Sequence, residues 1–274
     1  GGHWMFLKLA KFALCAVMAT GLLGGVAHAA QCGNNSSGFE RWKTQFSAEA
    51  KVNGIGRRGL QALASTRYAT KTIHADRNQK SFRYSLQKFM QVRGSNTIIS
   101  QGKRRKAANA NFFAAIERKY GVPAGPLLAI HGMETGFGRF MGNSNVMSAI
   151  ATLAYDCRRS QFFTGHLYAA LQLVDRGVIS SNTRGAMHGE IGHTQFLPGS
   201  VLKYGVDGDG NRRLDLAGSQ WDALASTANF LRAHGWRRGG GYQPGQANFR
   251  AIQGWNAAGV YQKAIAIMAA EIDK

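Results

Sequence analysis

The chain has 274 residues, 45% of them hydrophobic, and Lys and Arg outnumber Asp and Glu by 34 to 14. The resulting formal net charge of +20 favours a polyanionic partner, such as DNA, an anionic membrane surface or an acidic cell-wall polymer. The net charge therefore indicates an acidic partner, but it does not distinguish among these three classes.

Residues 1–29 are interpreted as a secretory signal peptide, with a short upstream remnant before Met5. Its parts are the basic residues Lys8 and Lys11, the apolar run 12–26 and the cleavage site Ala27-His28-Ala29. The apolar run is short for a membrane-spanning helix and contains three glycines, so export is favoured over a retained anchor. We therefore expect a periplasmic protein without stable membrane insertion, whose formal charge falls from +20 to +18 after cleavage.

The predicted export determines which cysteines the mature chain keeps. Cys15 would leave with the signal, so the exported chain keeps Cys32 and Cys157. In an oxidising compartment these two are candidates for a disulfide that pins the N-terminal tail to the domain. Two unpaired thiols are the alternative, because counting does not prove a pair. The Cys and His residues show no metal-ligand spacing, so no zinc-type site is expected.

Residues 30–274 contain no repeat, low-complexity segment or long linker, and the chain has 4 prolines and no sustained polar–apolar alternation. This pattern predicts a mainly α protein. Helices are expected at residues 39–52, 57–66, 85–92, 103–120, 127–134, 146–155, 161–176, 198–204, 220–234 and 259–272. The polar stretch 71–100 is expected to cross the surface, and the glycine-rich stretch 239–256 to be irregular with few short strands. This length suits one α-rich domain, with two helical lobes around a cleft.

One carboxylate, Glu134, ends an apolar helical run directly before the glycine-rich segment 136–138. A carboxyl group among apolar side chains resists ionisation and can act as a general acid near neutral pH. The alternative is a helix end capped by glycine, with Glu134 exposed on its last turn.

Motifs on both sides of Glu134 occur in a characteristic order. They are Tyr120-Gly121-Val122-Pro123, the segment Met133 to Arg139, the segment Ala151 to Asp156 with Arg158-Arg159, Gly192 to Pro198, Tyr204 to Gly210, and Asp222 to Phe230. Together they resemble the B-type lytic murein transglycosylases, the membrane-bound lytic transglycosylase B family, which have a lysozyme-like fold and cleave peptidoglycan. The resemblance runs from about Phe39 to the C-terminus and implies a lysozyme-like transglycosylase domain with a saccharide-binding cleft.

The resemblance implies a role for particular side chains. Glu134 would be the sole catalytic acid and base, and Gln195 would line the saccharide groove. The other implied substrate-binding residues are Arg158 and Arg159 for substrate carboxylates, Asn256 beside the scissile bond, and Phe137 and Trp255 as faces for sugar rings. The expected partner is a peptidoglycan glycan strand, bound by a monomer, with no nucleic acid and no required cofactor.

The implied reaction needs only one carboxylate. Ordinary glycosidases use two at a set distance, and here the nearby candidates for a second are Asp156, Asp175 and Glu190. In the transglycosylase reaction the muramyl C6 hydroxyl replaces water and gives a 1,6-anhydro end. A muramidase-type hydrolase and a non-catalytic wall-binding protein are the alternatives.

Two residues depart from the family pattern. Glu190 in Gly189-Glu190-Ile191-Gly192 replaces a small residue, and His193 stands where an uncharged polar or aromatic residue is common. Glu190 is interpreted as a surface or structural residue, with a second carboxyl near the cleft as the alternative. His131, one helical turn before Glu134, is interpreted as a packed or supporting residue.

An Asp-rich loop begins within the fifth motif. Its candidate metal ligands have calcium-loop spacing and are Asp207, Asp209, Asn211, Arg213 and Asp215. The pattern is incomplete, because Arg212 replaces the turn glycine and Gly218 replaces the bidentate acid. We therefore expect a weak structural calcium site or an Asx-turn loop without calcium.

Overall fold

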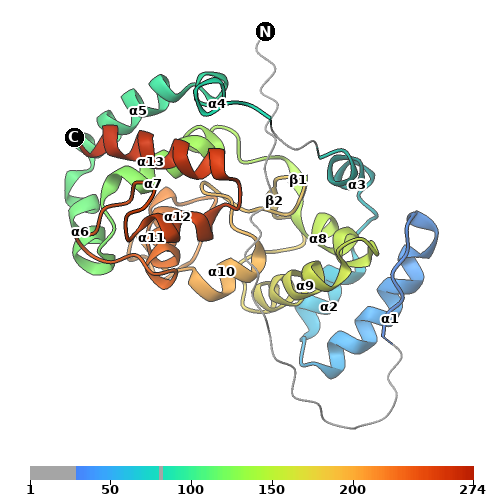
Figure 1. Ribbon diagram of the computed structural model, residues 1–274. Coiled ribbons are helices and arrows are strands. Elements are labelled where there is room, and N and C mark those ends of the chain that lie inside the picture. The colour runs from blue at the N-terminus through green and yellow to red at the C-terminus, as the bar shows by residue number, and fades with distance from the viewer. Residues whose placement is uncertain (1–28, 80–82) are drawn as a thin grey trace.

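The computed structural model describes residues 29–79 and 83–274 and is mainly helical (Figure 1). The first elements are η1 (Ser36–Gly38), α1 (Phe39–Val52), α2 (Arg57–Ala64), α3 (Thr70–Arg77), α4 (Leu86–Arg93), α5 (Ser95–Ala108), α6 (Ala110–Tyr120) and α7 (Ala124–Thr135). They are followed by β1 (Ser144–Asn145), α8 (Val146–Tyr155), α9 (Ser160–Asp175), β2 (Arg184–Gly185), α10 (Pro198–Tyr204), α11 (Gln220–Ala233), α12 (Phe249–Trp255) and α13 (Gly259–Asp273). The predicted signal peptide lies outside the described residues, apart from Ala29. Within the described part of the chain, no helix has both the length and the apolarity needed to cross a bilayer.

The helices form two groups (Figure 1). In one group α9 packs against α8 and α2, with α1 and α3 beside them. In the other, α7 packs against α13 and α5, while α11 and α12 complete the group. Helix α10 contacts both α9 and α11 and so joins the groups. The antiparallel pair β1–β2 is the sheet of the described residues.

Helix α7 is the centre of the second group, because each of its residues from Ala124 to Thr135 is buried. The extended Pro123 precedes it, and Gly136 ends it in the left-handed conformation at φ 56°. A Cβ atom on Gly125 would lie 2.3 Å from the backbone oxygen of Ala269 in α13. Glycine therefore allows α7 and α13 to pack backbone against backbone, which fixes the segment that ends at Glu134.

The predicted helix 103–120 is wrong, because two helices cover this region and separate at Asn109. Asn109 has φ −128° and ψ 36°, and both its backbone N–H and its side-chain amide donate to the backbone oxygen of Arg105. These bonds satisfy the end of α5 and turn the chain. The polar stretch 71–100 is also more helical than expected, with α3, α4 and the start of α5, and α12 forms within the stretch 239–256.

The N-terminal segment is attached to the end of α8 by a covalent bond and hydrogen bonds. Cys32 and Cys157 form a disulfide with a Cα–Cα distance of 5.0 Å. Beside it, the backbones of Gly33 and Asp156 form a parallel bridge, and the Tyr155 hydroxyl donates to the backbone oxygen of Asn35 at 2.6 Å. Of the two alternatives for these cysteines, the structure thus contains the disulfide.

We predict that replacing both Cys32 and Cys157 with Ser lowers the free energy of unfolding by about 4 kcal/mol, because the disulfide closes a long loop with a sequence separation of 125 residues. Thermal denaturation with and without a reductant measures this. The reductant should lower the melting temperature of the wild type and leave that of the double variant unchanged. Equal melting temperatures of wild type and double variant would contradict the prediction.

Candidate active site

The carboxyl group of Glu134 lies at the end of α7 with 7% of the residue exposed. Its Oε1 accepts a hydrogen bond from the Tyr261 hydroxyl of α13 at 2.7 Å and another from the Trp255 indole N–H of α12 at 3.3 Å. The expected alternative of an exposed last-turn residue is therefore wrong. Helix α7 thus meets α12 and α13, which lie far from it in the sequence, at this carboxyl group.

Tyr261 and Trp255 both donate to Oε1 as uncharged groups. Burial, and then the charge of Glu134, raise the pKa of Tyr261 well above its usual value. The phenol thus stays protonated and remains a donor at any working pH, and the indole N–H of Trp255 does not titrate. Two such donors stabilise the carboxylate that forms when Glu134 gives up a proton, without supplying a competing acid.

Gln195 lies in a tight turn near this carboxyl group in the fold. The residue has φ 64° and is 1% exposed, and its side-chain amide donates to the backbone oxygens of Gly192 at 2.7 Å and Met141 at 3.3 Å. The next residue, Phe196, packs its ring at 5.4 Å from that of Trp255. The Gln195 turn is therefore connected to Glu134 through Trp255.

Trp255 has a different place from the one predicted. We expected it to offer a ring face to sugars, but its side chain is completely buried between Phe196 and Phe230. Its indole N–H donates to Glu134 Oε1 at 3.3 Å. The adjacent Asn256 is 2% exposed, and its Oδ1 accepts from the backbone N–H of Ala258 at 2.9 Å.

Phe137 is also mostly enclosed. It is 6% exposed, has φ 60°, and lies between the Arg105 guanidinium at 4.6 Å and the His131 ring at 5.3 Å from its centroid. The contacts of Phe137, Gln195 and Asn256 with a saccharide stay predictions.

Arg158 and Arg159, predicted to bind substrate carboxylates, point to a carboxylate of the protein itself. Arg158 Nη1 lies 2.8 Å from an oxygen of Asp76 in α3, and Arg159 Nη2 bonds the other oxygen. His188 Nε2 lies 3.3 Å from Asp76 as well. The Arg158 side chain is 47% exposed and that of Arg159 is 18% exposed. A substrate role for the pair stays a prediction, and Arg158 is the more accessible of the two.

The candidates for a second catalytic carboxylate are engaged elsewhere. Asp156 is 2% exposed and pairs with Arg77 at 2.7 Å. Asp175 accepts from two backbone N–H groups at the start of α2, those of Gly56 and Gly59. Glu190 is 9% exposed and accepts from the backbone N–H of His188 at 3.0 Å. Each has a structural task, in agreement with a mechanism that uses one carboxylate.

Sequence reasoning missed two residues of functional interest. Tyr261 donates the shorter of the two hydrogen bonds to Glu134. It lies five residues after Asn256, and its partner is revealed only by the contact between α7 and α13. Asp76 stands in a polar stretch with no motif around it. Its role became visible only through the arginines that surround it.

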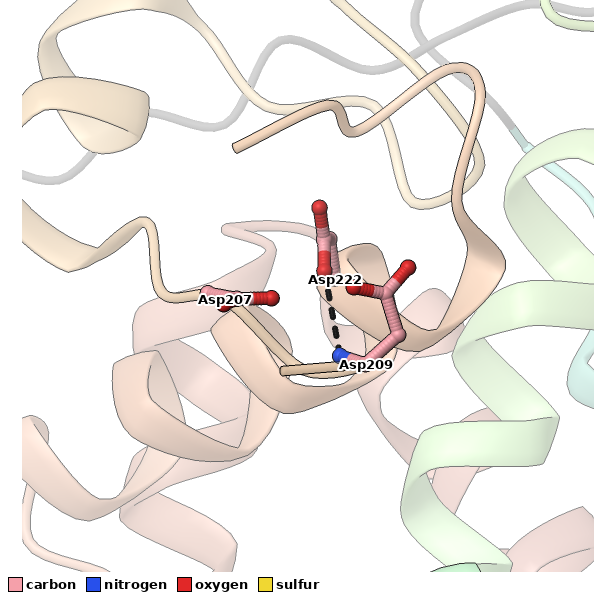
Figure 2. A group of neighbouring side chains, drawn as sticks. All are labelled: Asp207, Asp209 and Asp222. Atoms are coloured by element: carbon pink, nitrogen blue, oxygen red, sulfur yellow. Dashed lines mark hydrogen bonds between the residues drawn. The ribbon is translucent and has the colours of Figure 1, made fainter. Parts of the chain in front are cut away.

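Three carboxylates of the Asp-rich region gather at one point (Figure 2). Oxygen atoms of Asp207, Asp209 and Asp222 lie within 4.8 Å of one another. Asp222, on the first turn of α11, was not among the predicted ligands, and it also accepts from the backbone N–H of Gly208 at 2.8 Å. Asp222 is therefore a further candidate ligand beside Asp207 and Asp209, and the rest of the predicted ligand set stays a prediction.

The other predicted ligands are turned to the loop itself. Asp215 accepts from the backbone N–H groups of Ala217 and Gly218, and Asn211 accepts from that of Arg213. Arg212 takes φ 66°, the left-handed conformation for which calcium loops use glycine.

Comparison with known proteins agrees with this arrangement. Residues 38–244 match the transglycosylase SLT domain family. The chain belongs to this family. Over 125 residues it is 38% identical to membrane-bound lytic murein transglycosylase B of Escherichia coli (strain K12). That stretch covers 44% of this chain and about a third, 34%, of the relative.

Solved structures of transglycosylases share the fold. SltB3 from Pseudomonas aeruginosa, in complex with NAG-anhNAM-pentapeptide, has a TM-score of 0.78 at 29% identity, covering 84% of this chain and 78% of that one. The Escherichia coli lytic transglycosylase Slt35, in complex with calcium, has a TM-score of 0.74 at 20% identity, covering 92% and 98%. The predicted family and fold class are therefore confirmed.

We predict that Arg159→Ala lowers the free energy of unfolding at pH 7 by about 2 kcal/mol, because it leaves the buried Asp76 with fewer partners. Burial alone would raise the pKa of Asp76, but the bond from His188 and the charges of Arg159, His188 and Arg158 hold it below its usual value. The stabilisation by Asp76 is thus present at neutral pH and is lost as the pH falls below about 4.

Denaturant unfolding between pH 3 and pH 7 tests this, with the exposed Arg176→Ala as a control that should behave as wild type. The difference between wild type and Arg159→Ala should shrink toward pH 3. Unchanged stability together with weaker binding of wall fragments would instead support the substrate role of Arg159.

Proposed function

We propose that this chain is a lytic transglycosylase that cleaves the bond between N-acetylmuramic acid and N-acetylglucosamine in peptidoglycan strands, with Glu134 as the single acid and base. The observation that carries this proposal is the buried Glu134 carboxyl group, held by two uncharged donors at the end of α7. The family membership and the complex of SltB3 with an anhydro-muramyl peptide support the same reaction.

The chemistry follows from having one carboxyl group. Glu134 first donates its proton to the glycosidic oxygen, and the bond between this oxygen and muramyl C1 breaks. The Glu134 carboxylate, stabilised by Tyr261 and Trp255, then accepts the proton of the muramyl C6 hydroxyl while that oxygen attacks C1. The product is a 1,6-anhydro ring, and no water is consumed. The sugar supplies its own nucleophile, so the protein must hold the C6 hydroxyl in place.

The location and partners follow from the same proposal. Peptidoglycan carries lactyl and peptide carboxylates, which suit a chain with a formal charge of +20. A periplasmic location agrees with the signal expected in residues 1–29 and with the Cys32–Cys157 disulfide. We expect a monomer that binds no nucleic acid and needs no membrane insertion.

We predict that wild type releases muropeptides ending in 1,6-anhydro-N-acetylmuramic acid, and that Glu134→Gln releases none, because the amide cannot donate and recover a proton. Mass spectrometry of products from purified peptidoglycan measures this, and thermal denaturation checks that the variant folds. The matched control is Glu190→Gln, which removes a carboxylate bonded to the backbone of His188 and should keep the activity.

Other products would point elsewhere. Products one water heavier, with reducing ends, would identify a muramidase, and loss of cleavage in Glu190→Gln would then make Glu190 its second carboxylate. Binding of peptidoglycan without any cleavage by wild type would identify a wall-binding protein.

We propose weak calcium binding at Asp207, Asp209 and Asp222, with a structural effect and none required for catalysis. Their close carboxylate oxygens fit a cation. An acid at position 218 would have to displace the Asp215 side chain, since a Cβ atom on Gly218 would lie 2.2 Å from Asp215 Oδ2. The calcium complex of Slt35 supports an ion in this fold, where it would bring the loop and the start of α11 together.

We predict that 10 mM calcium stabilises the wild type by about 1.4 kcal/mol, as expected for a dissociation constant of about 1 mM. Asp209→Asn should abolish this effect, because it removes one of three clustered carboxylates. Thermal denaturation with calcium, compared with magnesium at equal ionic strength, measures the shift. An equal shift in the Asp209→Asn variant would place the ion elsewhere, and no shift in wild type would show that the loop folds on its own hydrogen bonds.

A further inference from the structure

Two histidines meet beside α7, one helical turn before Glu134. His131 of α7 lies one turn before Glu134 and is completely buried, while His193 belongs to the turn that carries Gln195. Their ring nitrogens, Nε2 of His131 and Nδ1 of His193, lie 3.0 Å apart. This distance is that of a hydrogen bond, which needs one proton between the two nitrogens.

The surroundings of the pair select where the protons lie. Nδ1 of His131 is buried with no hydrogen-bond partner, so a proton there would be an unsatisfied donor. We therefore assign the proton of His131 to Nε2, which donates to His193 Nδ1. A hydrogen bond with the backbone of Ala217 favours a proton on His193, and this proton must lie on Nε2, because Nδ1 faces His131.

Both rings are held in the neutral state that this arrangement requires. Burial lowers the pKa of His131 well below its usual value, and the charges of His193 and Arg105 lower it further. Burial lowers the pKa of His193 too, as does Arg105 of α5, against the raising effects of Ala217 and Asp215. Arg105 and Asp215 are thus the charged groups that act on the pair.

The same turn has a second bond to the catalytic helix. The Thr135 hydroxyl donates to the backbone oxygen of His193 at 2.6 Å and accepts from the backbone N–H of Gly138 at 2.9 Å. A Cβ atom on Gly138 would lie 2.4 Å from the His193 ring, so the segment after Glu134 closes around that ring. His193 therefore contacts both the helix end with Glu134 and the turn with Gln195.

We propose that the His131–His193 hydrogen bond is a positioning device that sets the Gln195 turn in register with the Glu134 carboxyl group. This inference rests on the proposed function, because it concerns the placement of the general acid relative to the saccharide groove. Neither histidine is a catalytic residue, since both act through the neighbours that they hold. Thr135 fixes the backbone of the turn, and the histidine pair fixes its rotation about that contact.

Matched variants separate hydrogen bonding from packing. In His131→Gln the amide nitrogen can replace Nε2 as the donor, and in His193→Asn the side-chain oxygen can replace Nδ1 as the acceptor. His131→Leu and His193→Leu keep bulk and lose the bond. With a soluble peptidoglycan tetrasaccharide, we expect kcat to fall about tenfold in both Leu variants, with KM within about twofold. The Gln and Asn variants should keep kcat within about threefold of wild type.

The bond also has a spectroscopic signature that needs no substrate and no variant. Long-range proton–nitrogen NMR of histidine-labelled wild type should show His131 protonated on Nε2, and His193 protonated on Nε2 with an accepting Nδ1. Folded Leu variants with wild-type kcat would overturn the proposal, as would equal losses in the Leu variants and their Gln and Asn counterparts. A proton on Nδ1 of His131 would overturn it even where the variants fail to fold. Wild type that releases no anhydro products refutes the proposed function instead and leaves the NMR result standing.

Discussion

The antiparallel packing of α13 on α7 is the constraint on which the site depends. Near the start of α13, the Tyr261 hydroxyl binds Glu134 at the end of α7. At the other end of α13, Asp273 accepts from the backbone N–H of Gly125 at the start of α7, at 2.7 Å. One helix thus holds the other at both ends, and the missing side chain of Gly125 allows their backbones to approach. The acid is placed by a rigid helix pair, whereas a loop would leave it mobile.

The scarce acidic residues of this basic chain are largely committed to structural tasks. Asp76 and Asp156 bind arginines, while Asp175 and Asp222 bind backbone N–H groups at the starts of α2 and the Asp-rich loop. The oxygens of these carboxylates are thus occupied by bonds that hold the fold together. Glu134 Oε1 accepts from the phenol of Tyr261 and the indole of Trp255, which belong to the helix pair described above and to α12.

The sequence predicted most of the helices, because their ends are marked by local signals. Helices α1, α8 and α10 begin and end where periodicity and the Pro198 start predicted. Asn109 divides α5 from α6 through bonds of its own amide, which the run of helix-forming residues conceals. The position of Glu134 at the end of a helix was likewise predictable from the glycine-rich segment that follows it.

The tertiary contacts of the site were not predictable in the same way. The burial of Trp255 between Phe196 and Phe230 and the pairing of Arg159 with Asp76 both depend on contacts between segments that are distant in the sequence. A resemblance to a family suggests what a residue does, but it does not say which part of its side chain is accessible to solvent in this chain. The arginines show this most clearly, since their adjacency suggests an anion site, and the anion is supplied by α3.

Backbone strain makes the two sides of the site interdependent. Phe137 and Gln195 both have positive φ without being glycine, and each such residue costs about 1–3 kcal/mol that its surroundings must offset. His131 contacts Phe137, and His193 is two residues from Gln195, so the bonded histidines join the two strained segments. In the proposed positioning role, this hydrogen bond between the two rings ties the Glu134 helix end to the Gln195 turn, and it fixes a direction that an apolar contact would leave free.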